Sequence, residues 1–360
     1  MCQNLRTVDG NVTTMGRGFS WEFDFLSTYY DKLTLEDRIF WALLIIEQIY
    51  YPFLAIVGVP VNLVTIVILS RGKCGLSKCV TRYLVAMSMA DLLVVILDLI
   101  LRHIPIVYWE HFDFVRSIPV CNIHAVLLYT AADCSVWFTV TFTFDRFVAI
   151  CCPKLKTKYC TERTSSVILG TVTVLSGLKD ITWYFMLLRT YWLLNYPWFC
   201  AVSVTAATSP VWTTIELIHY IVTPFAPFVL ILLLNALTIR HILVASRARR
   251  RLHGPSCGEK PRDPEMESRR KSIILLFVIS GNFILLWAIF VMSSIWNRVS
   301  YFTAGSIVAT GFVTEMGFML QLLTCCTNTV IYAVTQTKFR QQLKDLLKCP
   351  ITLIVKFIKR

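Results

Sequence analysis

The chain has 360 residues, of which 56% are hydrophobic and only 16% are charged, and its mean hydropathy is +0.62. This composition is too apolar for an ordinary soluble domain, so we expect a membrane protein in contact with lipids. The net charge of +13 does not call for a nucleic-acid partner, because a basic inner face beside anionic lipid accounts for it.

Long apolar stretches recur along the chain, and each is long enough to cross a bilayer. We expect an all-α membrane protein, a seven-transmembrane helix bundle followed by a short cytoplasmic amphipathic helix. The predicted spans cover residues 42–70, 80–101, 122–151, 165–188, 211–243, 272–296 and 303–334. The predicted parts are an extracellular N-terminal tail (1–41), the transmembrane domain (42–334), and the amphipathic helix with the cytoplasmic tail (335–360).

The positions of lysine and arginine predict the orientation of these spans. Most of the 35 basic residues lie in the first, third and fifth connections between spans and in the C-terminal tail, which places these segments in the cytosol. The N-terminus then faces outward, in agreement with a glycosylation sequon at Asn11. Residues 1–20 contain no apolar core of a cleavable signal, so the first span is expected to direct its own insertion.

The chain has thirteen cysteines, an odd number, so at least one thiol has no partner within the chain. Only Cys2, Cys121 and Cys200 fall on the predicted outer side. A disulfide between Cys121 and Cys200 would join the top of the third span to the loop between spans four and five, and two separate thiols are the alternative. Cys349 follows the amphipathic stretch and is either palmitoylated or a free thiol.

Polar residues within the spans are costly to bury and therefore indicate partners, water or a functional path. Asp91 lies in the middle of the second span, and Asn62, Ser135 and Asn328 lie at a comparable depth in other spans. These oxygen-bearing side chains could hold a small hard cation. A hydrogen-bonded network with water and no ion is the alternative, and the sequence leaves both open.

The third span has an inward and an outward face. Leu128 and Ser135 share the direction of Arg146, into the bundle, whereas Trp137 points away from it. Asp133 points toward spans four and five, where its candidate partners are Lys179, Asp180 and His219. An ion pair or hydrogen bond that fixes the packing is favoured there over ligand binding.

Several side chains near the outer ends of the spans could line a small-molecule cavity, because such sites are mostly apolar with a few placed polar groups. Ordinary core packing is the alternative for each of them. The candidates are Arg102, Leu128, Tyr129, Glu216, His219, Tyr220, Phe290, Ser294, Glu315 and Phe318. We find no supported nucleophile–base pair, metal-ligand run or phosphate loop, so we expect no enzyme, no metal centre and no cofactor other than the possible small cation.

Over most of residues 45–349 the chain resembles the rhodopsin-like (class A) G-protein-coupled receptors. The order and spacing of several motifs carry the resemblance: Asn62, Ser88 to Asp91, Cys121, Asp145-Arg146-Phe147, Pro227, Phe283 to Trp287, Asn328 to Tyr332, and Phe339. The phrases 58–70 and 135–140 look like the orphan subgroup that contains aromatic-amino-acid-sensing receptors.

The resemblance implies a plasma-membrane receptor that passes the signal of an extracellular small molecule or peptide to heterotrimeric G proteins. Arg146, restrained by Asp145, would lie where the G protein enters, and Trp287 would be a packing switch beneath the ligand. The implied coupling and switch residues are Asp145, Arg146, Phe147, Phe283, Trp287, Asn328 and Tyr332. The implied sodium-type site consists of Asp91, Ser135 and Asn328.

The chain departs from the family pattern where the family's helices usually bend. Ile289 and Thr329 stand in place of prolines in spans six and seven, and Asn235 stands in place of a tyrosine in span five. Without its proline, the sixth span keeps its backbone hydrogen bond and has less reason to kink. Leu128 replaces the aspartate of amine receptors, and Phe290 replaces an arginine of the aromatic-amino-acid subgroup. The alternative function is therefore a non-signalling or constitutively active seven-span scaffold or heteromer partner.

Overall fold

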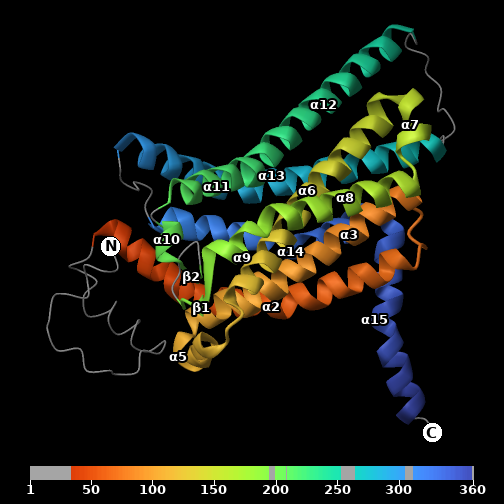
Figure 1. The fold of residues 1–360 in the computed structure, drawn as a ribbon. Coiled ribbons are helices and arrows are strands. Elements are labelled where there is room, and N and C mark those ends of the chain that lie inside the picture. The colour runs from red at the N-terminus through yellow and green to blue at the C-terminus, as the bar shows by residue number, and fades with distance from the viewer. Residues whose placement is uncertain (1–33, 194–198, 208, 253–263, 305–310, 359–360) are drawn as a thin grey trace, which may run out of the picture.

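Long helices that run side by side make up most of the computed structural model (Figure 1). It describes residues 34–193, 199–207, 209–252, 264–304 and 311–358. The long elements are α2 (Leu35–Ser70), α3 (Lys78–Val94) with its continuations η3 (Val95–His103) and α4 (Ile104–Val107), α6 (Cys121–Cys151), α8 (Glu162–Asp180), α11 (Pro210–Tyr220) with η5 (Ile221–Phe225) and α12 (Ala226–Leu252), α13 (Pro264–Ala304) and α14 (Gly311–Thr335). The predicted all-α bundle is confirmed.

Shorter elements connect the long helices at both ends of the bundle. These are α5 (Trp109–Phe112), η4 (Asp113–Ser117), α7 (Pro153–Tyr159), α9 (Thr182–Met186), α10 (Val204–Ala207) and the strands β1 (Leu187–Tyr191) and β2 (Cys200–Val202). A further helix, α15 (Thr337–Ile358), follows α14. The strands form an antiparallel pair in which Tyr191 lies opposite Cys200, a hairpin that the sequence did not predict. α15 leaves the bundle at a steep angle (Figure 1), and Phe339 in its first turn is fully buried against Tyr332.

Six helices in the described part of the chain are long and apolar enough to cross a membrane. They correspond to predicted spans one, two, three, five, six and seven. α8, the fourth, is not among them, because charged residues occupy both of its ends and serine and threonine are frequent between them. It nevertheless packs against α3 and α6 within the bundle.

Two predicted span boundaries were wrong. The fourth helix ends at Asp180, and Leu187 and Leu188 belong to β1. The seventh helix begins at Gly311, and residues 303 and 304 are the end of α13. The first helix begins at Leu35, before the predicted span, but its membrane-length apolar part is Trp41–Ser70, in agreement with the prediction. An apolar stretch shows that a segment is buried, but it does not show where one element ends and the next begins.

Side-chain caps explain two of the helix starts. The Ser77 hydroxyl accepts a hydrogen bond from the Val80 amide at the start of α3, and the Thr161 hydroxyl accepts one from the Thr164 amide at the start of α8. Such caps satisfy amide groups that have no partner within the helix. Both caps lie at the end of the bundle where the predicted cytoplasmic connections are, and they fix the depth at which these two helices begin.

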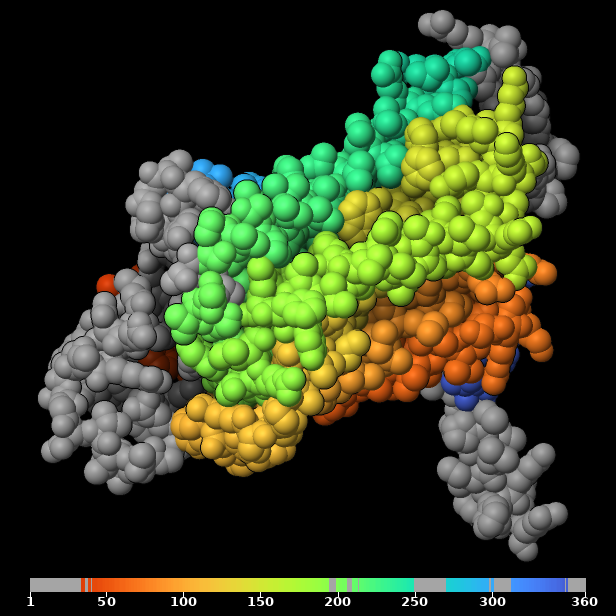
Figure 2. Space-filling view, viewed as in Figure 1, coloured from red at the N-terminus to blue at the C-terminus, as the bar shows by residue number. Residues whose placement is uncertain are grey.

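α8 is a peripheral helix. Figure 2 shows it as a yellow-green band across the visible face, beside the green α11 and α12. Its buried residues are Ser165, Ser176 and Asp180, all of them polar. The helix is therefore attached to the bundle through polar contacts as much as through apolar packing.

Candidate functional site

A disulfide between Cys121 and Cys200 fastens the β hairpin to one end of the bundle. Cys121 is the first residue of α6 and Cys200 is on β2, and both are buried. Trp183 and Phe199 pack around the bond. The predicted disulfide is confirmed, and it places the hairpin next to the cavity described below.

A cavity of about 70 Å³ lies between the helices at this end. This volume holds a few waters, less than the several hundred Å³ of a typical small-molecule site. Its walls come from η3, α6, α11, η5, α13 and α14. The lining residues are Asp98, Arg102, Leu128, Tyr129, Ala132, Asp133, His219, Tyr220, Thr223, Pro224, Trp287, Phe290, Phe318 and Gln321.

Seven of the ten predicted pocket residues line this cavity. Of the other three, Ser294 lines a second, nearly apolar cavity of about 220 Å³ between α11, η5 and α13. Glu216 and Glu315 are buried, but they belong to the lining of neither cavity. Sequence reasoning missed Asp98, although it lies one helical turn before Arg102, a spacing that brings two side chains together.

The Asp98–Arg102 pair forms a charged wall of the cavity. Arg102 Nη1 donates a hydrogen bond to Asp98 Oδ1 over 2.8 Å, and both side chains are buried. The guanidinium also lies 5.3 Å from the ring centre of Phe199 and 5.8 Å from that of Phe318, close enough for cation–π attraction. A buried charge needs such partners, so this pair is held in place with one side facing the cavity.

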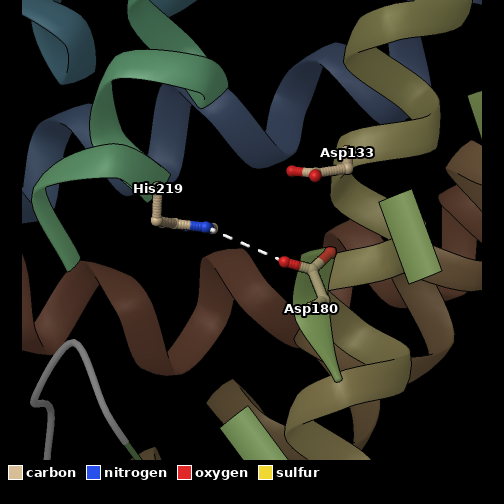
Figure 3. A group of neighbouring side chains, drawn as sticks. All are labelled: Asp133, Asp180 and His219. Carbon is tan, nitrogen blue, oxygen red and sulfur yellow. Dashed lines mark ion pairs between the residues drawn. The ribbon is translucent and has the colours of Figure 1, made fainter. Parts of the chain in front are cut away.

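A second charged group joins three helices beside the same cavity. Lys179 Nζ lies 2.6 Å from Asp133 Oδ2 and 3.1 Å from Asp180 Oδ1. It also lies 3.0 Å from His219 Nδ1. The expected partners of Asp133 are thus in place, and Figure 3 shows Asp133, Asp180 and His219 pointing toward one another. Because its ammonium reaches α6 and α11, Lys179 anchors the peripheral α8.

Trp287 forms the inner end of the cavity. Its ring stacks on Phe283 at 5.0 Å between ring centres, and Phe290 packs edge-on against it at 5.8 Å. Phe283 and Trp287 belong to a buried cluster with Val136, Val140 and Ile231. A molecule entering the cavity would therefore press on the contact between α13 and α6.

Asp91, Ser135 and Asn328 meet in the middle of the bundle. Ser135 Oγ donates to Asp91 Oδ1 over 2.5 Å, and Asn328 Nδ2 donates to Asp91 Oδ2 over 2.6 Å. All three side chains carry oxygen atoms, which suit a hard cation. Both carboxylate oxygens are engaged by donors, so sodium would bind after Asn328 turned its amide group. The residues present fit such an ion.

Arg146 ties α6 to α13 at the opposite end of the bundle. Arg146 Nε donates to Asp145 Oδ2 over 3.0 Å, and Nη1 donates to Ser272 Oγ over 3.1 Å. Cys79 Sγ donates to the other carboxylate oxygen of Asp145 over 3.2 Å. Burial and the Asp145 carboxylate raise the pKa of the Cys160 thiol to about 12, so this thiol stays protonated and donates to the Asp145 carbonyl over 3.6 Å.

The remaining predicted switch residues lie near this end or along α14. Phe147 is half-buried with its ring 6.4 Å from that of Phe144. Tyr332 is fully buried and packs against Phe339 of α15. Thr329, in place of proline, shares a 2.7 Å hydrogen bond with the Thr65 hydroxyl and also donates to the Val61 carbonyl over 3.0 Å.

Both helices that lack a family proline are continuous. α13 runs through Ile289 and α14 runs through Thr329 without a break. Sequence reasoning saw Thr329 only as a missing bend, whereas the structure shows it as a tether between α14 and α2. The signal available in the sequence was the presence of two threonines, Thr65 and Thr329, at the same depth in their spans, where they could form a hydrogen bond with each other.

One predicted modification site lies outside the described residues, and the side chain of the other is not described. Asn11 falls among residues 1–33, and nothing is described of the Cys349 side chain. Glycosylation of Asn11 and palmitoylation of Cys349 therefore stay predictions.

Comparison with known proteins agrees with this architecture. The sequence profile of the family described as 7 transmembrane receptor (rhodopsin family) matches residues 61–332. The G-protein coupled receptor 39 of Mus musculus is 27% identical over 149 residues, which cover 41% of this chain and 32% of that receptor. Because the match spans about a third of the relative, what the whole relative does is not carried over. The family match covers most of the chain and agrees with the helical bundle and its disulfide, so the chain belongs to the rhodopsin family of seven-transmembrane receptors.

Proposed function

We propose that this receptor resides in the plasma membrane with its N-terminus outside and passes the signal of an extracellular small molecule or peptide to heterotrimeric G proteins. The observation that carries the proposal is the double restraint on Arg146, which contacts Asp145 on its own helix and Ser272 on α13. A partner that enters between the inner ends of α6 and α13 must break the Ser272 contact and would then meet a free guanidinium.

The cavity at the disulfide end of the bundle, called the outer cavity below, and the hydrogen bonds that hold Arg146 at the opposite end involve the same pair of helices. This arrangement supports coupling between the two sites. Leu128 and Arg146 are both on α6, and Trp287 and Ser272 are both on α13. A ligand that binds an expanded cavity more tightly than the closed one shifts the population toward the expanded state. With only about 70 Å³ in the closed cavity, almost any ligand larger than a few waters would favour expansion.

We also propose that sodium binds at Asp91 and favours the closed state. The Asp91 carboxylate would take the ion together with the Ser135 hydroxyl and the Asn328 amide oxygen. The ion would supply a positive charge that the buried carboxylate lacks.

A second candidate function is a seven-span partner protein that does not signal or is constitutively active. Two features of the switch helices favour it: α13 has no interruption at Ile289, and Thr329 ties α14 to α2 through Thr65 and Val61. A receptor with these restraints needs more binding energy from its ligand to reach the open state, or it opens by a smaller movement of α13 and α14.

Nucleotide exchange on purified G proteins tests both candidates. The full chain would be placed in nanodiscs and incubated with each family of heterotrimeric G protein, without ligand and with a ligand library, beside the Arg146→Ala variant. The receptor function predicts faster exchange in at least one G-protein family and its loss in the variant. No response in any family, together with identical behaviour of Arg146→Ala, would favour the partner protein.

A further inference from the structure

We propose that Asp133, Asp180 and His219 form a binding site for a divalent transition metal, with zinc as the best-suited ion. The three residues come from α6, α8 and α11, and their ligand atoms lie within 4.8 Å of one another. Figure 3 shows the side chains converging from these separate helices. Zinc binds both carboxylate oxygen and imidazole nitrogen, and in open sites three protein ligands leave one position for water or another ligand.

The electrostatics of the group favour a cation. Asp133 and Asp180 are 1% and 0% exposed, and isolated buried carboxylates are costly unless a positive charge lies beside them. Lys179 supplies one positive charge for the two. Thr223 lies close enough to act as a weak donor to Asp133, and Trp183 does the same for Asp180. Asp133 Oδ1 and Asp180 Oδ2 nevertheless accept no hydrogen bond of good geometry within the described residues, so these oxygens can still bind an ion.

Lys179 marks the position of the cation. Its ammonium lies within 3.1 Å of an atom of each of the three residues, as a bound ion would. A zinc ion must displace it, and the Lys179 side chain is 22% exposed, so its flexible stem has a way out toward solvent or lipid headgroups. The two positive charges of zinc then balance the two negative charges of the carboxylates, whereas the single positive charge of the ammonium does not.

The His219 imidazole is held by its neighbours in a position from which it could bind the metal. The His219 ring packs edge-on against Tyr129 and Trp183, with 5.4 Å between ring centres in each case. A metal ligand fixed by its neighbours loses little freedom on binding. The presence of a nitrogen ligand selects zinc over magnesium or calcium, which prefer oxygen.

The outer cavity provides access and space. Asp133 and His219 both line it, so an ion arriving there meets two of its three ligands at once. A tetrahedral ion with bonds of ~2.0 Å holds its ligands ~3.3 Å apart. The ligand atoms, which lie within 4.8 Å of one another, must therefore draw together by at most about 1.5 Å once Lys179 has left. The cavity volume of about 70 Å³ leaves room for water as the fourth ligand.

Metal binding can be measured on the purified full chain after treatment with a chelator. Thermal unfolding would be followed at rising zinc chloride, and cobalt chloride would serve as a spectroscopic probe, because tetrahedral cobalt absorbs visible light. We expect zinc to raise the unfolding temperature and cobalt to give the tetrahedral spectrum. The Lys179→Met variant, which lacks the competing cation, should need about ten-fold less zinc for the same effect. His219→Gln and Asp180→Asn should lose both signals.

The controls separate metal binding from a purely structural ion network. Glu162→Gln removes an exposed carboxylate from the other end of α8 and should leave the zinc response unchanged. If Lys179→Met does not fold, the zinc and cobalt responses of the wild type and of His219→Gln still test the proposal. His219→Gln is suitable for this because it keeps the ion pairs of Lys179. The proposal is overturned if wild type shows neither signal, or if both persist in His219→Gln. No G protein enters these measurements, so their failure would leave the proposed function standing.

Discussion

The Arg146–Ser272 hydrogen bond leads to a quantitative prediction. Ser272→Ala removes the acceptor of the 3.1 Å bond from Arg146 Nη1, which joins a charged donor to a partly buried hydroxyl. Such bonds contribute about 1.5 kcal/mol at the lower end of their range. If the bond exists only in the closed state, its loss shifts the equilibrium toward the open state about ten-fold.

The assay is ligand-free nucleotide exchange by a responsive G protein in nanodiscs with equal amounts of folded receptor. We expect Ser272→Ala to raise basal exchange by up to about ten-fold, where the open state is the minor one. Ser272→Thr keeps the hydroxyl and should stay close to wild type. The reasoning is refuted if Ser272→Ala leaves basal exchange unchanged, or if Ser272→Thr raises it equally.

A matched control lies on the same inner side of the bundle. Glu162 pairs with Arg82 at 2.6 Å and with Lys78 at 3.5 Å. The hydrogen bond from Arg82, followed by the charge of Lys78, holds the pKa of the Glu162 carboxyl below its ordinary value. Because water screens exposed pairs, Glu162→Gln should not alter basal exchange, which separates loss of the Arg146 contact from loss of any polar contact there.

Three further measurements follow from the contacts within the bundle. In a double-mutant cycle on thermal unfolding, Thr65→Val and Thr329→Val should show a coupling of about 1 kcal/mol, and additive effects would refute the tether. Replacing Cys121 and Cys200 by serine removes a link across 79 residues and should lower the unfolding free energy by up to about 4.5 kcal/mol, whereas an unchanged unfolding temperature in the absence of reductant would contradict it. Sodium chloride should raise the unfolding temperature by about 3 °C over choline chloride, Asp91→Asn should abolish the difference, and a difference that survives in Asp91→Asn would exclude sodium from that site.

The spans and the contact between Asp145 and Arg146 could be predicted because their signals are local. A long apolar stretch can be recognised without knowing its neighbours, and Asp145 and Arg146 are adjacent in sequence. Helical phase also gave the direction of Asp133, because its position relative to Arg146 depends only on the count of residues along one helix. The predicted partners of Asp133 were found in contact for this reason.

Features that depend on several helices could not be predicted. The ligand atoms of the proposed metal site come from residues 133, 180 and 219. These residues are far apart in the sequence, so they do not form one of the short, regularly spaced motifs by which metal sites are usually recognised. The β hairpin follows an apolar stretch that was assigned entirely to the fourth span, and the pairing of its strands is a tertiary property. The Thr65–Thr329 contact depends on the relative rotation of two helices that are far apart in sequence.

The central claim is that Arg146 is the group through which this receptor meets a G protein. Its most direct test is ligand-free nucleotide exchange by the Asp145→Asn variant, which removes the charge that restrains Arg146, beside the Asp145→Asn/Arg146→Ala double variant. We predict that Asp145→Asn accelerates exchange in at least one G-protein family and that the double variant does not. Equal exchange by wild type, Asp145→Asn and the double variant in every family would contradict the claim.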